Sequence, residues 1–600
     1  MEDWTPVNEP LTTARFSGLY GHWYPHGRSD ATFARCLLTQ CRAVVAAMRA
    51  IREVVPHARL VQTEDLGKTF STPHLRYQAE FENARRWVTF DLLTGRLAPA
   101  DPMWAWLAEA AGGDESELEW LRVNTCPPAI VGVNHYLSSE RFLDERVDGY
   151  PAHVHGGNGH DAYADVLAAR VVLEGTAGPA ELLRETWERY SLPLAVTEAH
   201  NGCTREEQLR WLLEVWRSAE LVRAEGADVR AVTIWSLLGA SGWSELVASP
   251  DDRYEPGVFD VRGPRPRATA IATLARDLAA GRPIEHPAAS GPGWWRRPTR
   301  LHHQPVSLGA RGAGYVPPGA ARPLLVTGAT GTLGRAVAAG CEARGLPYRL
   351  LARRDMDIAD PASAEAALAA IRPWAVVNTA GFVRVDAAEA ARDACRRENA
   401  EGAAVLAAAC AETAIGLVTF STDLVFDGGK RAPYVEGDAP APLNVYGATK
   451  AEAERRVLAV HPAALVVRTS AFFGPTDDHN FVTVALRALA AGRRFAAADD
   501  AVVSPTYVPH LVDAVLDLLI DGEHGLWHLA NAGAVTWAEL AEAAADECKT
   551  PAGSLEPVPT TALRLAAARP LFSALASERG VLLPPLDEAL AEYASARALP

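Results

Sequence analysis

An apolar run followed by three evenly spaced glycines constrains the fold of this chain more than any other segment. The run covers Leu324–Thr327, the glycines are Gly328, Gly331 and Gly334, and an Ala-rich stretch follows. Glycines at this spacing permit a tight turn and let the backbone approach a pyrophosphate at the start of a helix. A glycine triplet alone is also common in ordinary turns. Because an apolar run precedes this one and a helical pattern follows it, we predict a dinucleotide-binding unit.

Short apolar β-rich runs alternate with longer Ala- and Leu-rich runs along most of the chain, which predicts the α/β class. The stretch 281–323 is rich in Pro and Gly and lacks apolar periodicity, so we predict a linker there, although Trp294 and Trp295 would favour packing. Domains are therefore expected at 1–280 and 324–600. In the second domain we expect strands at 324–327, 349–352, 375–378, 417–421, 465–469 and 526–530. Their order predicts a Rossmann-type, doubly wound parallel sheet with a small substrate-binding subdomain.

The composition argues against several classes of partner. The 600 residues include 58 Lys and Arg against 74 Asp and Glu, a net charge of −16, so we expect no nucleic acid partner. We predict no membrane span and no signal peptide. The eight cysteines form no CxxC pair or Cys/His cluster, which favours reduced thiols in the cytoplasm and no metal site. A homodimer is compatible with the sequence, which leaves the oligomeric state open.

The segment 446–450 carries the residues suited to carbonyl reduction. Tyr446 and Lys450 are four residues apart and would share one face of a helix. An ammonium near the phenol can lower its pKa, and the tyrosine can then give a proton to a carbonyl oxygen while hydride reaches the carbon. This spacing alone is common on ordinary helices. Its position about 120 residues after the glycine loop, with Ser421-Thr422-Asp423 on an intervening strand, favours a catalytic role.

Two arginines at the tip of the second expected strand bear on the choice of cofactor. Arg353 and Arg354 suit the 2′-phosphate of NADPH, whereas a carboxylate at this position would bind the ribose hydroxyl of NADH. An ordinary solvated surface pair is the alternative interpretation. Asp355 and Asp357 lie close to the pair, so we expect NADPH and leave NADH open.

Six runs together resemble the dTDP-4-dehydrorhamnose reductase family of extended short-chain dehydrogenases. They stand in the family's order, at 378–381, 421–428, 446–450, 468–470, 480–481 and 504–507. The resemblance implies reduction of the C4 keto group of a nucleotide-linked sugar, with Thr422, Tyr446 and Lys450 as the catalytic triad. It implies cofactor contacts from Gly328, Thr330, Gly331, Leu333, Gly334, Arg353, Arg354, Asp357, Ile358, Thr379, Ala380, Gly381 and the supporting Asn399.

Three positions depart from that family pattern. Leu424 stands where the family has tyrosine, Ala471 where it has an aromatic residue, and Phe572 where asparagine is usual. All three touch the expected sugar pocket, so the identity of the keto-sugar stays open. The expected reaction, reduction of a keto group, is unaffected.

The N-terminal half resembles family 1 glycoside hydrolases in the order of four runs, at 4–10, 132–136, 194–198 and 229–238. The resemblance implies a TIM barrel with Glu9 as general acid/base and Glu198 as nucleophile of a retaining mechanism. Only five strands are readable, around 4–8, 60–64, 130–134, 194–197 and 230–235. We therefore predict a partial barrel, either truncated or a relic, without glycosidase activity.

Three functional hypotheses follow. The leading one is a keto-sugar reductase that uses NADPH. The second is a regulatory module that binds NADP without catalysis, which the intact set of Thr422, Tyr446 and Lys450 disfavours. The third is a bifunctional protein with a working β-glycosidase, which the missing strands disfavour.

Overall fold

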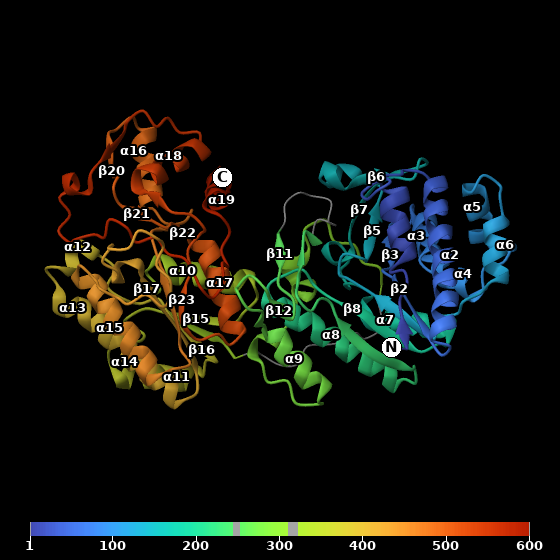
Figure 1. Ribbon diagram of the computed structural model, residues 1–600, viewed down its shortest axis with the longest axis horizontal. Helices are drawn as coiled ribbons and strands as arrows, with labels where there is room; N and C mark the ends of the chain where they lie inside the picture. Colours follow the sequence, from blue (N-terminus) through green and yellow to red (C-terminus); the bar gives the residue numbers. More distant parts are fainter. Residues whose placement is uncertain (1, 244–252, 310–321, 599–600) are drawn as a thin grey trace. The chain divides into compact units, whose positions relative to one another are not determined.

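The computed structural model describes residues 2–243, 253–309 and 322–598, and the chain forms two compact α/β units (Figure 1). Unit 1 consists of Met1–Phe259, Ile271–Ile284 and Ala289–Gly319. Unit 2 consists of Asp260–Ala270, Glu285–Ala288 and Ala320–Pro600. Unit 2 thus takes in two short segments upstream of the glycine loop.

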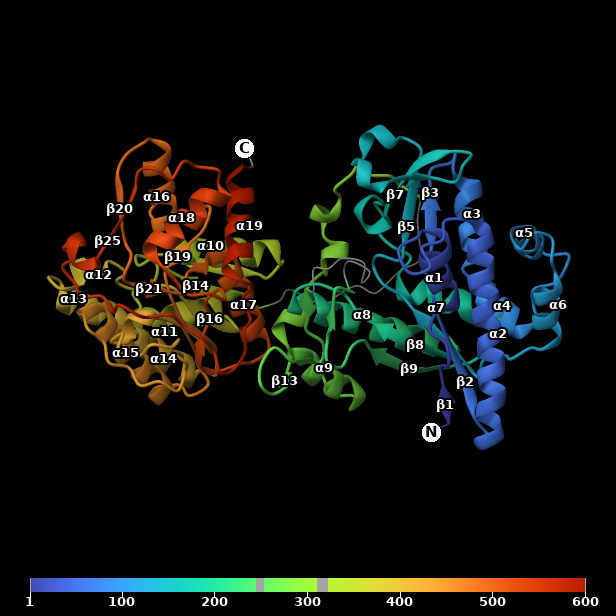
Figure 2. The same cartoon turned by 45° about the horizontal axis from the view of Figure 1, so that its top comes forward.

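Unit 1 is built on a five-stranded parallel sheet with the order β1-β2-β4-β8-β9. Its strands are β1 (Asp3–Trp4), β2 (Arg59–Asp65), β4 (Ile130–Asn134), β8 (Leu194–Ala199) and β9 (Val229–Ile234). The sheet curls as half of a barrel would (Figure 2). The described residues do not close it into a barrel, so a TIM barrel is not confirmed and the observed fold is a curled parallel half-barrel.

The long helix α2 (Asp30–Val54) covers one side of this sheet. Its N-terminus is capped by Ser29, whose Oγ accepts a hydrogen bond from the Thr32 backbone N–H at 3.2 Å. Its buried residues Phe33, Leu37, Val44 and Met48 recur at helical spacing and join one apolar core with β2, α4, α5 and α6. The other elements of unit 1 are α1 (Pro10–Ala14), β3 (Thr69–Ser71), α3 (Arg76–Arg85), α4 (Val88–Thr94), α5 (Pro102–Ala110), α6 (Ser116–Val123), β5 (Arg141–Asp144), β6 (His155–Gly157), β7 (Ala162–Leu167), α7 (Gly178–Tyr190), α8 (Arg205–Ala224) and most of α9 (Ala270–Ala279).

The segment of the expected linker around Trp295 packs against α8 within unit 1. Trp295 is only 2% exposed, and its ring lies edge-on to that of Trp211 with centroids 5.2 Å apart. Its indole N–H donates to Glu214 at 2.9 Å, and Arg296 forms two further hydrogen bonds with the same carboxylate. Residues 310–321 of the expected linker lie outside the described residues.

Unit 2 has a six-stranded parallel sheet with the order β15-β14-β16-β17-β18-β23, which confirms the predicted Rossmann-like fold of the C-terminal half. The strands are β14 (Leu324–Thr327), β15 (Tyr348–Leu351), β16 (Ala375–Asn378), β17 (Gly416–Thr422), β18 (Leu465–Thr469) and β23 (Gly525–His528). Helices α10 (Thr332–Ala343) and α17 (Val508–Ile520) cover one face, and α11 (Pro361–Ile371), α14 (Gly402–Glu412) and α15 (Val445–Val460) cover the other (Figure 2). β15 and β16 lie on opposite sides of β14, so the strand order reverses at β14. Open α/β sheets usually bind ligands at such a topological switch point.

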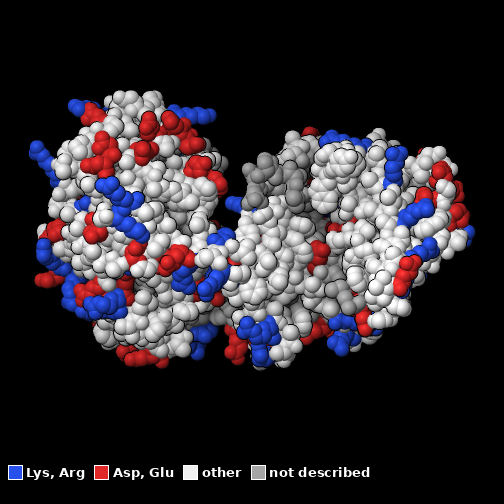
Figure 3. All heavy atoms as spheres, in the orientation of Figure 1, with Lys and Arg blue, Asp and Glu red and all other residues white. Residues whose placement is uncertain are grey.

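A smaller subdomain of unit 2 gathers around α16 (Phe481–Ala490), α18 (Trp537–Glu547) and α19 (Leu586–Ala598). Phe473, Leu486, Leu540 and Tyr593 form its core. On the face seen in Figure 3, acidic and basic side chains of unit 2 are interspersed. Among the helices of the described ranges, none combines the length and the apolar character needed to cross a membrane.

A cluster of ion pairs ties the upstream segment Asp260–Ala270 into unit 2. Arg267 contacts Asp521 at 2.8 Å and Asp260 at 2.9 Å, and both carboxylates are almost fully buried. We expect Arg267→Leu to lower the free energy of unfolding of unit 2 by about 3 kcal/mol, because it leaves buried negative charge without this cation. Urea unfolding of the full chain measures the change.

The matched control is Arg494→Leu, which breaks the exposed pair with Glu556 and should change the stability by less than about 1 kcal/mol. Equal unfolding midpoints for the two variants would show that the upstream segment does not stabilise unit 2.

Candidate active sites

The glycine loop of unit 2 has the close backbone packing that its sequence predicts. Gly328 has φ +80°, and a Cβ there would meet the Thr379 Oγ1 atom at 2.5 Å. A Cβ at Gly334 would lie 2.4 Å from the Gly328 carbonyl oxygen. Gly331 is the N-cap of α10, while Thr330 is exposed and Leu333 is buried. The loop therefore brings backbone to the N-terminus of α10 without side chains in the way.

The loop after β16 is held against β14 beside the glycines. The Thr379 hydroxyl donates to the Thr327 carbonyl at 2.6 Å, and the Thr327 Oγ1 atom accepts from the Ala380 N–H at 3.1 Å. A Cβ at Gly381 would lie 2.8 Å from the Asn399 Oδ1 atom and 3.5 Å from the Lys450 Nζ atom. The structure thus brings Thr379, Ala380 and Gly381 between the glycine loop and the Tyr–Lys helix.

Some of the residues expected to determine cofactor specificity lie on the surface, and one is buried in the core. Arg353 and Arg354 are exposed just beyond β15, where Arg353 pairs with Glu398 at 2.7 Å. Asp357 pairs with Arg397 at 2.8 Å. Ile358 is buried in the apolar core beneath α11 and α14, so its side chain faces away from the exposed arginines.

Tyr446 and Lys450 lie on α15, next to the end of β17 that carries Thr422. Asn444 caps this helix, its Oδ1 atom accepting from the Gly447 N–H at 2.7 Å. A Cβ at Gly447 would come within 2.1 Å of the Leu424 carbonyl oxygen. Glycine at this position therefore lets α15 approach the strand end closely.

The ammonium of Lys450 is held in place by the sheet. Its Nζ atom donates to the Phe420 carbonyl at 3.1 Å and lies 5.9 Å from the centre of the Tyr446 ring. Asn399 supports this region from a buried position, donating to the Phe382 carbonyl and to the Thr449 hydroxyl, each at 3.1 Å.

The ionisation of the Tyr–Lys pair differs from the expectation. Burial raises the pKa of the Tyr446 phenol, and the nearby Asp423 raises it further. Burial lowers the pKa of Lys450 to about 8. The predicted lowering of the tyrosine pKa by the lysine is therefore wrong for this structure, because desolvation outweighs the attraction of an ammonium held on a neighbouring carbonyl.

Asp423 is a site residue that the sequence analysis missed. Its carboxylate is buried and accepts hydrogen bonds from the hydroxyls of Thr422 at 2.9 Å, Ser470 at 2.8 Å and Ser573 at 2.6 Å. Burial raises the pKa of Asp423. Asp423 and Ser470 belong to runs at 421–428 and 468–470 that the sequence had marked, whereas no sequence signal points to Ser573.

In unit 1, Glu9 and Glu198 converge on one asparagine. Glu9 precedes α1 in a left-handed conformation, with φ 43°, and its Oε1 atom accepts from the Asn134 amide at 2.7 Å. Glu198 lies on β8 and also hydrogen-bonds Asn134 and Asn8, while the Tyr136 hydroxyl donates to it. One side-chain amide can reach both carboxylates only where they lie close together.

The two carboxylates of unit 1 have raised pKa values. Burial raises the pKa of Glu198 to about 7, against the lowering effect of Asn134 and Asn8. Burial also raises the pKa of Glu9 well above its usual range, with contributions from Asp65, Glu198 and Glu64. Asp65 and Asn134 are further residues of this site that the sequence analysis did not assign.

Comparison with known proteins finds similarity in the C-terminal half of the chain. Residues 322–593 match the family model described as RmlD substrate binding domain. The dTDP-4-dehydrorhamnose reductase of Mycobacterium tuberculosis is 37% identical over 285 residues, which are 46% of this chain and 93% of that protein. The dTDP-4-keto-6-deoxy-D-glucose reductase of Streptomyces niveus is 35% identical over 252 residues, 42% of this chain and 87% of that protein.

Among solved structures, the dTDP-4-dehydrorhamnose reductase of Bacillus anthracis in complex with NADP is 30% identical, with a TM-score of 0.43, and the match covers 45% of this chain and 98% of that one. The chain spans most of the length of these relatives. Through its C-terminal half, the chain belongs to the dTDP-4-dehydrorhamnose reductase (RmlD) family of oxidoreductases.

Proposed function

We propose that unit 2 reduces the C4 keto group of a dTDP-linked sugar with NADPH. The observation that carries this proposal is the approach of Tyr446, Lys450 and Thr422 to one another beside the glycine loop. Names of the relatives support the substrate class, since they refer to dTDP-linked keto-sugars. The departures at Leu424, Ala471 and Phe572 leave the individual sugar to experiment.

The chain fits a dinucleotide at the glycine loop. Gly328 and Gly334 leave space that a Cβ would fill, and Gly331 exposes the N-terminus of α10. Arg353 and Arg354 would hold a 2′-phosphate at the tip of β15. NADPH bound here supplies a hydride.

The protein's own groups supply and hold the proton. A phenol with a raised pKa stays protonated at neutral pH, so Tyr446 can donate to the carbonyl oxygen as that oxygen gains negative charge. Lys450 brings positive charge to the same region. Asp423 accepts a hydrogen bond from the Thr422 hydroxyl and so fixes the direction of that hydroxyl. The roles proposed for Tyr446, Lys450 and Asp423 rest on these contacts.

The experiment is NADPH oxidation by the full chain against a panel of nucleotide-linked keto-sugars, with the dTDP-linked 4-keto-6-deoxy sugars as the expected substrates. A regulatory module would bind NADPH without consuming it. Binding without oxidation of any member of the panel would therefore overturn the proposal in favour of that alternative.

Cofactor choice gives a separate prediction. We expect Arg353→Ala/Arg354→Ala to raise the KM for NADPH about ten- to a hundredfold, because charge-assisted hydrogen bonds to the 2′-phosphate are lost. The KM for NADH should hardly change, since NADH lacks that phosphate. Steady-state kinetics with both cofactors measure the effect, and Arg349→Ala, earlier on β15, is the control. An equal rise for both cofactors would refute the assignment.

We propose a second function for unit 1, the binding of a glycoside at Glu9 and Glu198. The observation that favours it is the shared contact of both carboxylates with Asn134, one of them, Glu9, lining a cavity together with Tyr136, His200 and Trp243. Paired carboxylates are the catalytic groups of retaining glycosidases. We propose that unit 1 binds a glycoside, and we still predict that it does not hydrolyse one.

A further inference from the structure

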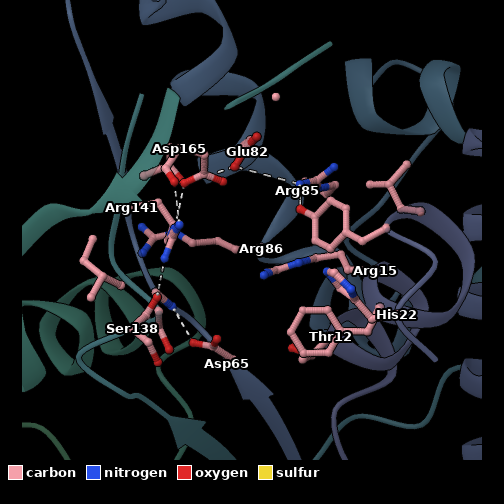
Figure 4. Close-up of a pocket in the computed structure, with 18 of the residues that line it drawn as sticks. Thr12, Arg15, His22, Asp65, Glu82, Arg85, Arg86, Ser138, Arg141 and Asp165 are labelled. Atoms are coloured by element: carbon pink, nitrogen blue, oxygen red, sulfur yellow. Dashed lines mark hydrogen bonds and ion pairs between the residues drawn. The ribbon is translucent and has the colours of Figure 1, made fainter. Parts of the chain in front are cut away.

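Unit 1 contains a cavity of about 1660 Å³ that Glu9 lines at one end. Figure 4 shows part of its wall, with Arg15 and Arg85 projecting from one side and Arg141 and Asp165 on the other. A cavity of this size exceeds what one sugar ring needs. The side chains in the rest of the wall therefore influence which glycoside the unit can bind.

The described wall of the cavity is more positive than the chain as a whole. It includes six arginines and five carboxylates, whereas the chain carries a net charge of −16. One of the five carboxylates is Glu9, whose raised pKa favours its neutral form. The cavity thus concentrates positive charge in a protein that is strongly acidic overall.

Three of the arginines in the wall have close protein partners, and one of them, Arg170, lies 3.2 Å from the His302 Nε2 atom. Arg86 contacts Glu185 at 2.5 Å and donates to the Leu66 carbonyl at 3.0 Å. Arg141 donates to the Asp165 side chain at 2.7 Å and to its backbone carbonyl at 2.8 Å. These contacts give Arg86 and Arg141 a structural role in holding the wall.

Arg15 and Arg85 are much less well satisfied. The Nε atom of Arg15 is buried and has no hydrogen-bond partner among the described residues. Arg85 is 6% exposed, and its acceptors among the described residues are distant: the Tyr20 hydroxyl at 3.5 Å and Glu82 at 3.9 Å. A guanidinium offers five donors, and leaving buried donors without acceptors is costly.

The two guanidinium groups flank the same tyrosine, so they can act on one ligand. The Arg15 Cζ atom lies 5.8 Å from the centre of the Tyr20 ring, whose hydroxyl accepts from Arg85 at 3.5 Å. Burial lowers the pKa of Arg15, but the nearby Tyr20, Asp65 and Glu82 outweigh that effect, so the pKa is raised and the side chain stays charged. Glu82 accepts from Thr69 and Gln78, and its distance of 3.9 Å from Arg85 is longer than a hydrogen bond.

We propose that Arg15 and Arg85 bind a carboxylate or phosphate group carried by a glycoside whose sugar ring lies at Glu9 and Glu198. Arg15 follows Glu9 by six residues along α1 and the helical turn after it, a path of roughly 9 Å. Because more than one helical turn of backbone separates Arg15 from Glu9, we place the charged group on the leaving group or on a neighbouring ring. This inference rests on the second function proposed for unit 1.

Calorimetric titration of the full chain with three compounds tests it: phenyl β-D-glucoside, its 4-carboxyphenyl analogue and its 4-phosphonooxyphenyl analogue. We expect at least one anionic compound to bind about tenfold more tightly than the neutral one, the effect of one charge-assisted hydrogen bond. The tighter of the two anionic compounds identifies the group. Arg15→Gln should abolish the preference and leave binding of the neutral compound unchanged, while Arg15→Lys should keep part of it.

The matched control is Arg28→Gln, which removes an exposed positive charge from the same wall and should keep the preference. Arg85→Gln provides a second variant in case Arg15→Gln lowers the thermal midpoint. Equal binding of neutral and anionic compounds, or a preference that survives in both glutamine variants, overturns the inference alone. Binding of none of the three compounds overturns the glycoside site itself and the inference with it.

Discussion

Tyr446→Phe should lower the kcat for keto-sugar reduction by about 10²–10⁴-fold, the usual effect of losing a general acid. The change removes one hydroxyl and keeps the aromatic ring on α15. Cofactor binding should be unchanged, because the glycine loop and the basic tip of β15 are untouched. Stopped-flow or steady-state NADPH oxidation gives kcat, and fluorescence titration gives the Kd for NADPH.

Tyr348→Phe, on β15 and away from the triad, is the control and should keep normal turnover. Near-normal kcat in Tyr446→Phe would remove the tyrosine from its catalytic role. A large loss of NADPH affinity would indicate instead that the phenol mainly shapes the cofactor site.

Lys450→Met should lower kcat by a comparable factor, because the positive charge beside Tyr446 is lost. In the wild type, burial lowers the pKa of this lysine to about 8. The ammonium is therefore present below about pH 8 and lost as the pH rises through that value. We expect kcat/KM of the wild type to fall above pH 8, about tenfold for each further pH unit, because kcat/KM reports the ionisations of the free enzyme.

The pH dependence of kcat/KM distinguishes this role from a structural one. Lys450→Met should lack the fall near pH 8, whereas Lys430→Met should keep it, since Lys430 pairs with Asp438 elsewhere in the unit. A fall near pH 8 that persists in Lys450→Met would assign the titration to another group.

The parallel sheets were predictable because apolar β-rich runs mark buried strands. The six strands expected between 324 and 530 all appear, with ends that differ by at most two residues. The order of the strands could not be read in the same way, since it depends on contacts between distant segments such as β14 with β16. The upstream segment Asp260–Ala270 was missed for the same reason: its place in unit 2 depends on the pairing of Arg267 with Asp521, 254 residues later.

The candidate site of unit 2 was predictable where its residues are neighbours in sequence. Tyr446, Lys450 and the glycine loop fall into short runs with known spacing, whereas Asp423, Ser470 and Ser573 meet only in the folded chain. The direction of the tyrosine pKa was wrong because it depends on burial and on Asp423, neither of which the spacing of two residues contains.

In unit 1 the two glutamates were predictable from the runs around them, while the positive wall of the cavity was not. Arg15 and Arg85 are 70 positions apart in the chain, and no periodicity relates them. Their lack of close acceptors is a property of the folded structure alone.

Hydride tracing tests the central claim most directly. The full chain is incubated with NADPH that carries deuterium at nicotinamide C4 and with a dTDP-linked 4-keto-6-deoxy sugar, and the product is examined by NMR. We expect the wild-type product to carry one deuterium at sugar C4. Under the same conditions, Tyr446→Phe should give no deuterated product. Bound but unconsumed NADPH, or a product without deuterium at C4, would contradict the central claim.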